Sequence, residues 1–248
     1  MSLSAIIIII IANLLVGVCV GMTGVAGFLL PLVYMFLVGM GYDESMLICF
    51  FTFMIIGYEG SRLHRKNFPV DKRLLVNLAA AGAVGAFAAV YIRGFITNDM
   101  AMKLLYGMVF FAGVSNLIPK KQNRIEDYSH IKTWMIWGIG VFVAIVCALS
   151  GAGGPILMIP ILMLLGVDAH EAIGVSMFQS VFIAIPTIIG FAMKVDLLKM
   201  VPLMVGCAFV HYVGTRIGVR YSKAISHKML KYIVSAIAIS VAIWKLFF

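Results

Sequence analysis

The residues best suited to binding a small anion lie in one glycine-rich segment, Ser150 to Pro155, which interrupts a long apolar stretch. Because each Gly costs a helix interior about 1 kcal/mol relative to Ala, Gly151, Gly153 and Gly154 predict a break between two helices. Pro155 suits the first turn of the second helix, where its missing N–H costs nothing. In a membrane, such non-helical backbone is tolerated only where protein buries it or where it lines a cavity. The segment therefore predicts a binding site.

A second segment, Gly21 to Pro31, repeats this order of features about 125 to 128 positions earlier, which is half of the 248 residues. In both halves an apolar helix with a cysteine, Cys19 or Cys147, leads to small residues, a short apolar run and Pro. Internal duplication with a broken helix in each half is typical of secondary transporters. We therefore expect one integral membrane domain made of two repeats, residues 1–125 and 126–248.

Both breaks supply candidate substrate-binding residues, because the unpaired N–H groups and the positive dipole end at the start of a short helix favour an anion. The alternative interpretation is close helix packing through small residues. The candidates are Thr23, Gly24 and Gly27 in the first break and Ser150, Gly151, Gly153 and Gly154 in the second.

Further polar candidates lie on neighbouring helices. Ser176, Gln179 and Ser180 follow i, i+3, i+4 spacing, which predicts three polar groups on one helical face. Thr52 is their weaker counterpart in the first half. Hydrogen bonding between helices, without a substrate, is the competing interpretation of these residues.

Three other residues are candidates for a gate or for ion coupling. His211 lies within an apolar run, where an ionisable side chain is costly unless it faces protein or water. Tyr58 and Glu59 lie next to a basic stretch, at the expected inner mouth. The pairs Asp168/Glu171 and Asp43/Glu44 are interpreted instead as caps at helix N-termini.

The composition identifies an integral membrane protein. With 63% apolar residues, 12% charged residues and a mean hydropathy of +1.09, the chain has more apolar surface than a soluble core of this length can hide. The net charge of +9 comes mainly from short loops, so it indicates orientation in the bilayer and not nucleic-acid binding.

We expect no enzyme activity, metal or cofactor, since motifs such as HExxH and GxSxG are absent. Four cysteines without CxxC spacing are interpreted as packing residues: Cys19, Cys49, Cys147 and Cys207.

The apolar runs predict an all-α fold with about 8 to 10 membrane helical segments. Polar loops at 62–73, 120–132 and 216–231 separate several of them, and if these loops face the cytoplasm, 14 of the 19 Lys and Arg lie inside. The half-length runs are Gly27–Gly39 and Ile156–Gly166; longer helices are expected at Ser4–Val20, Glu44–Tyr58, Leu74–Tyr91, Ala101–Leu117, Thr133–Leu149, Ala169–Met193, Leu197–Val213 and Tyr232–Phe248.

This orientation predicts that the two repeats have inverted topology, with the N- and C-termini both outside. The hairpins Ser4–Gly39 and Thr133–Gly166 then enter the membrane from opposite faces as re-entrant segments. We expect their glycine-rich tips to meet near the midplane.

Three segments carry a resemblance to a known family: Gly24-Val-Ala-Gly27 with Pro31, Gly151-Ala-Gly-Gly154 with Pro160, and Ala172-Ile-Gly-Val-Ser176. They resemble the TauE/SafE sulfite exporter family, also called the toluene sulfonate uptake permeases, and the similarity covers essentially the whole chain.

The resemblance implies a secondary transporter in the inner (plasma) membrane that exports small sulfur-containing anions, such as sulfite or sulfoacetate-like organosulfonates, by alternating access. An anion channel and a carrier of another small organic anion are the alternatives. The expected partners are the anionic substrate and the lipid bilayer, with no nucleic acid, and a homodimer is left open.

Overall fold

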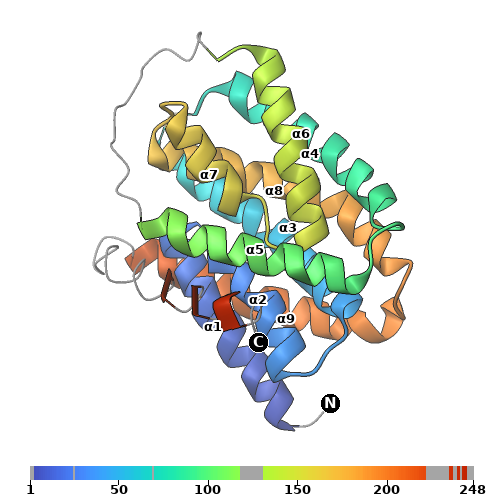
Figure 1. The fold of residues 1–248 in the computed structure, drawn as a ribbon. Coiled ribbons are helices and arrows are strands. Elements are labelled where there is room, and N and C mark those ends of the chain that lie inside the picture. The colour runs from blue at the N-terminus through green and yellow to red at the C-terminus, as the bar shows by residue number, and fades with distance from the viewer. Residues whose placement is uncertain are drawn as a thin grey trace.

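Every regular element that the structure describes is helical, as expected for an all-α membrane protein (Figure 1). The computed structural model describes residues 3–24, 26–68, 70–117, 131–221, 235–236, 239–240 and 242–244. Outside these residues lie most of the predicted 120–132 loop, the end of the 216–231 loop and most of the predicted last helix. The elements are α1 (Leu3–Thr23), η1 (Ala26–Phe28), α2 (Leu29–Leu32), η2 (Val33–Leu37), α3 (Tyr42–Asn67), α4 (Lys72–Ile92), α5 (Asn98–Leu117), α6 (Thr133–Ser150), α7 (Pro155–Leu164), α8 (Ala169–Ala192) and α9 (Leu197–Tyr221).

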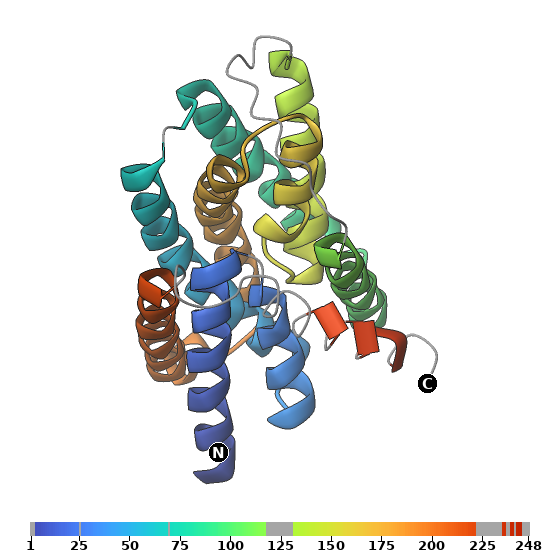
Figure 2. The ribbon, with the colours of Figure 1, turned by 90° about the vertical axis from the view of Figure 1, so that its left-hand side faces the viewer.

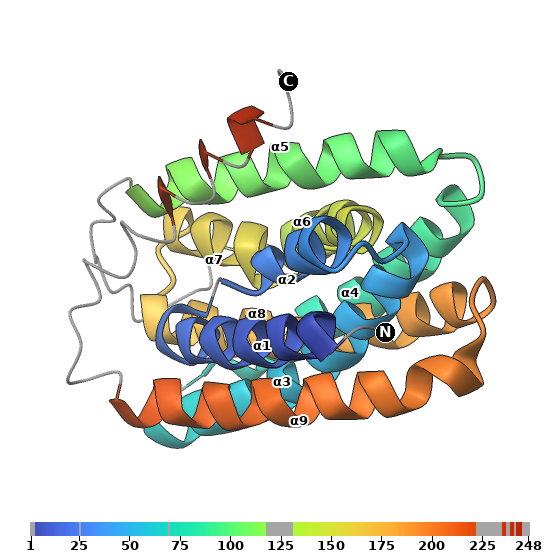
Figure 3. The same cartoon turned by 90° about the horizontal axis from the view of Figure 1, so that it is seen from below.

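Among the described residues, six helices are long and apolar enough to cross a membrane: α1, α3, α4, α6, α8 and α9. Two shorter apolar stretches, Ala26–Leu37 and Pro155–Leu164, correspond to the predicted half-length runs. In Figure 3, α5 lies along one edge of the bundle and α9 along the opposite edge. The helix α8 packs against both α3 and α4, which places it at the centre of the bundle.

Helices α1 and α9 approach closely through small residues. A Cβ on Gly17 would lie 2.5 Å from the His211 carbonyl oxygen, and one on Gly214 would lie 2.5 Å from the Leu14 carbonyl oxygen. Gly21 meets α9 in the same way about one turn further along. Small residues four apart allow this backbone contact between membrane helices. Because contacts advance in the same direction along both helices, α1 and α9 run parallel.

Two predicted helix ends were wrong. Helix α3 was expected to end at Tyr58, yet it continues through Arg62 and Lys66 to Asn67, and its 26 residues are long enough for a full crossing. Helix α9 likewise continues past Val213 to Tyr221. Lys and Arg are good helix formers and interact favourably with the carbonyl end of the helix dipole. Basic residues interpreted as loops therefore extend these helices.

Candidate functional site

The second glycine segment breaks the helix where expected. Helix α6 ends at Ser150, and Gly151 caps it with a φ of +72° while its N–H donates to the Cys147 carbonyl at 2.9 Å. Gly153 also has a positive φ, +80°, and Pro155 begins α7. Residues with a Cβ rarely adopt this left-handed conformation, so glycine is required at both positions.

The same segment is packed tightly against α3 and α8. A Cβ on Gly151 would collide with the sulfur of Met46 on α3. A Cβ on Gly154 would lie 2.8 Å from the Ser180 hydroxyl oxygen on α8. The break is therefore buried in protein, which is the condition for non-helical backbone in a membrane.

The first glycine segment also breaks its helix. Gly24 has a φ of +77°, and its N–H donates to the Val20 carbonyl at 2.8 Å. The Thr23 hydroxyl donates to the Cys19 carbonyl at 2.8 Å, within its own helix. Beyond the break, a Cβ on Gly27 would lie 2.8 Å from the Phe53 ring on α3.

The two breaks line one small cavity, which we call the break cavity. Figure 2 shows α1 and α6 approaching from opposite ends of the molecule, with the two breaks between them. The cavity volume is about 30 Å³, enough for about two water molecules. It is lined by Val20 of α1, by Gly24 and Gly27 at the first break, by Phe53, Ile56 and Gly57 of α3, by Ala152 and Gly153 at the second break, by Pro155 and Ile156 of α7, and by Met177 and Ser180 of α8.

The break cavity has few polar groups. Ile156 and Leu157 lie in the first turn of α7, where N–H groups have no acceptor within the helix. The Ser180 hydroxyl donates to the Ser176 carbonyl at 3.0 Å, which leaves its oxygen free to accept. Among the residues that the structure describes, no Lys or Arg lines the cavity. Backbone dipoles are thus the main source of positive potential in it.

The three polar residues predicted on one face of α8 point in different directions. Ser180 lines the break cavity, whereas the Gln179 amide donates to the Gly140 carbonyl of α6 at 3.3 Å. Positions i+3 and i+4 are about 100° apart around a helix, which is enough to reach different neighbours. Ser176 is buried outside the cavity lining, as is Thr52 of α3, and neither hydroxyl has a hydrogen-bond partner among the described residues.

The gate and coupling candidates also lie outside the cavity lining. Glu59 is buried and forms an ion pair with Arg62 at 2.8 Å, while Tyr58 is exposed. His211 is fully buried on α9, and within the described part of the chain neither ring nitrogen has a hydrogen-bond partner. The structure therefore does not bring these three residues to the two breaks.

The cap interpretation holds in part. The Asp168 carboxylate accepts from the His170 N–H at 2.9 Å, as an N-cap does. Glu171, expected to complete that cap, instead accepts from the Asp71 N–H at 2.7 Å and so joins α8 to the start of α4. The Glu44 carboxylate accepts from the Gly41 N–H at 3.2 Å, which caps α3.

The whole-chain comparison decides the family. The model of the family described as "Sulfite exporter TauE/SafE" matches residues 6–244. The chain belongs to this family. It is also similar to the probable membrane transporter protein YdhB of Bacillus subtilis (strain 168), with 24% identity over 221 residues that cover 84% of this chain and 89% of the relative. No solved structure matches the chain.

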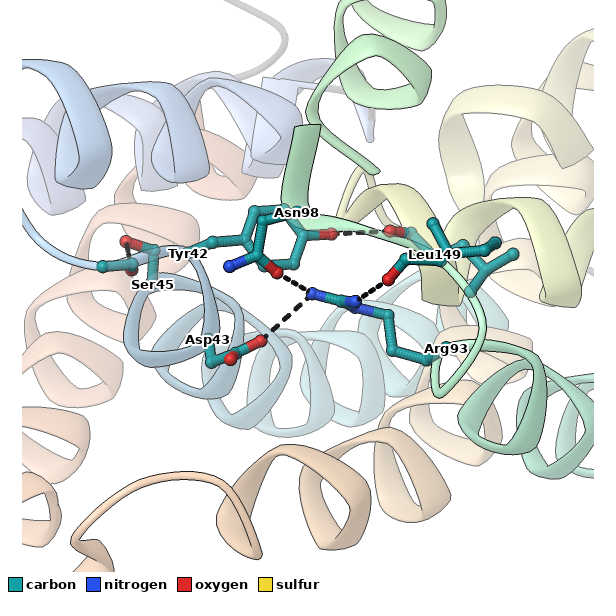
Figure 4. A network of polar contacts seen from close by, with 8 residues as sticks. Tyr42, Asp43, Ser45, Arg93, Asn98 and Leu149 are labelled. Atoms are coloured by element: carbon teal, nitrogen blue, oxygen red, sulfur yellow. Dashed lines mark hydrogen bonds and ion pairs between the residues drawn. The ribbon is translucent and has the colours of Figure 1, made fainter. Parts of the chain in front are cut away.

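One buried cation of this TauE/SafE protein was missed by the sequence analysis. Arg93, which no sequence pattern singled out, is 7% exposed and lies between Asp43 and Asn98 (Figure 4). Its guanidinium carbon lies 5.0 Å from the centre of the Tyr42 ring, and the Tyr42 hydroxyl donates to the Leu149 carbonyl at 2.6 Å. The network joins α3, α4 and the end of α6. In the sequence, the one sign that Arg93 is buried is its position directly after a long apolar run.

Proposed function

We propose that this TauE/SafE family membrane transporter carries small sulfur-containing anions, sulfite or organosulfonates, through the break cavity and out across the plasma membrane. The main support is that two glycine breaks from opposite halves of the chain line one cavity. Export is the direction given in the family description. The N–H groups at the start of α7 supply hydrogen-bond donors of the kind that favour an oxyanion.

Recognition through backbone dipoles suits a carrier. An oxyanion held by the backbone N–H of Ile156, which lines the cavity, gains a charge-assisted hydrogen bond without a buried counter-charge. A fixed Lys or Arg in the cavity would form a full ion pair that the substrate must break to leave. The proposed site therefore binds the anion moderately and releases it again.

The size of the break cavity supports alternating access. A volume of about 30 Å³ is smaller than a sulfonate with its organic group requires, so the cavity must widen to bind substrate. Glycines absorb backbone rotation most easily, and Gly24, Gly151 and Gly153 lie where the two hairpins turn. We therefore expect the hairpins to move against α3 and α8.

The test is counterflow of sulfite and of a small organosulfonate in proteoliposomes. Gly153→Leu introduces a side chain at a positive φ and 3.4 Å from Phe53, so it should abolish the flux. Gly138→Leu on α6 is the matched control, because a Cβ there meets nothing within 4 Å and the flux should be unchanged. Equal flux through both variants would remove the break cavity from the proposal. Flux without counterflow would favour a channel.

A further inference from the structure

A second, larger cavity lies where the ends of α4, α6 and α8 meet, and we call it the basic cavity. Its volume is about 210 Å³, and it shares no lining residue with the break cavity. It is lined by Ala89, Val90, Arg93 and Gly94 at the end of α4, by Ala148 of α6, and by Thr187, Gly190, Phe191, Met193 and Lys194 at the end of α8.

Arg93 brings a buried positive charge to the wall of the basic cavity. One terminal nitrogen donates to the Ile96 carbonyl at 2.6 Å, and the other donates to Asp43 at 3.3 Å and to Asn98. The third nitrogen, Nε, is buried and has no partner among the described residues. An anion in the cavity would therefore be attracted by the charge of the guanidinium and not by this shielded N–H group.

Lys194 adds positive charge that no nearby acid neutralises. In the described part of the chain, the acidic residues at this end are engaged elsewhere: Asp43 pairs with Arg93, Asp99 with Lys103 and Asp196 with Lys199, while Glu44 caps the Gly41 N–H. No ion pair of Lys194 occurs among the same residues. The basic cavity thus has a net positive wall and favours an anion.

The rest of the lining is mainly apolar. Ala89, Val90, Ala148 and Phe191 contribute hydrocarbon surface, and the Thr187 hydroxyl already donates to the Ile183 carbonyl at 2.7 Å. A small inorganic anion would leave this surface unused. A ligand with an anionic head and an apolar body would satisfy both parts of the wall.

We propose that the basic cavity binds a singly charged oxyanion with an apolar tail, the head against Arg93 and Lys194 and the tail against α4 and α8. This chemistry belongs both to an alkyl or aryl sulfonate or carboxylate in solution and to the head group of an anionic lipid. The site is separate from the break cavity, because Phe191 stacks on Phe50 at 6.2 Å and Phe50 lies 6.0 Å from Phe53. The proposal therefore stands whether or not the break cavity carries substrate.

The experiment measures binding of hexanesulfonate to purified protein in phosphatidylcholine nanodiscs at low ionic strength. Lys194→Gln should weaken binding about fivefold, since it removes a partly solvated charge, and Lys194→Arg should retain it. Lys199→Gln is the matched control, because Lys199 is 82% exposed, pairs with Asp196 and does not line the cavity. The series is repeated in a Gly153→Leu background, which separates this site from the break cavity.

A lipid occupant is distinguished by adding phosphatidylglycerol. If the head group occupies the cavity, phosphatidylglycerol should compete with hexanesulfonate, and mass spectrometry of the intact protein should show the lipid retained by Lys199→Gln and lost from Lys194→Gln. If a free anion is the ligand, the lipid should not compete. Hexanesulfonate and phosphatidylglycerol binding that is equal in Lys194→Gln and Lys199→Gln would overturn the proposal.

Discussion

At the residue scale, Asn13 and Tyr34 show how a buried polar pair joins the two arms of the first hairpin. Both side chains are fully buried, and the Tyr34 hydroxyl donates to the Asn13 amide oxygen at 2.9 Å. The Asn13 amide nitrogen donates to the Ile9 carbonyl at 2.8 Å, which fixes the orientation of the amide. Neither residue was singled out from the sequence, because one Asn and one Tyr in apolar runs form no pattern.

Tyr34→Phe should therefore destabilise the protein by about 1–3 kcal/mol, because it leaves the buried Asn13 oxygen without a donor. The double variant Asn13→Leu/Tyr34→Phe should recover part of this loss, since both polar groups are then gone. The free energy of unfolding in detergent measures both effects. A double variant less stable than the sum of the two single variants would contradict this interpretation.

Arg93 offers a second test at this scale, of a buried ion pair against an exposed one. Arg93→Ala should cost about 3 kcal/mol, because it leaves Asp43 and the Tyr42 ring without their shared partner. Lys103→Ala should cost at most about 0.5 kcal/mol, since Lys103 and Asp99 are both more than half exposed. Thermal unfolding of the two variants measures the difference. If both variants lost the same stability, burial of the Arg93 ion pair would not explain its contribution.

At the scale of elements, the contact between α1 and α9 depends on glycine. Gly214→Leu should cost about 3 kcal/mol or prevent folding, because its side chain would meet the backbone of α1 at Leu14. Gly206→Leu, on the same helix, should be tolerated, because nothing lies within 4 Å of a Cβ at that position. Size-exclusion chromatography and thermal unfolding of both variants would show the difference. Similar behaviour of the two would mean that α1 does not pack as described.

The same scale shows what the sequence could predict. Both breaks were found because Gly and Pro have local, nearly context-free costs in a helix. The ends of α3 and α9 were missed because Lys and Arg are common both in loops and in last helical turns. The direction of Gln179 was missed because helical spacing specifies an angle and not the neighbour at that angle. The contact of Arg93 with Asp43 joins residues 50 positions apart, which local sequence patterns do not reveal.

At the scale of the whole molecule, orientation in the membrane remains a prediction from charge. The positive-inside rule places the 120–132 loop in the cytoplasm and the turn between α8 and α9 outside. In a background without native cysteines, Asn123→Cys should react with an impermeant maleimide only after the membrane is opened. Asp196→Cys should react in intact cells. The reverse pattern would invert the topology and with it the proposed direction of export.

Alternating access is the last prediction, and the break cavity provides its two reporters. Val20 lines the cavity from α1, and Ala152 lines it from the second break, so each belongs to a different hairpin. Both are less than a tenth exposed, so a rise in the labelling of a cysteine at either position reports a change in access to the cavity. A carrier should open the cavity to one side at a time, since each hairpin turns at glycines and enters from its own end of the molecule.

Val20→Cys and Ala152→Cys are therefore to be labelled with an impermeant maleimide in right-side-out and inside-out vesicles, with and without an organosulfonate. Substrate should raise labelling from one side and lower it from the other at both positions, because one conformation replaces the other. Gly138→Cys on α6, where a Cβ meets open space, serves as the control. Its labelling from either side should not change when the organosulfonate is added. If the anion raised labelling from both sides together, the two mouths would be open at once, and the protein would conduct as a channel.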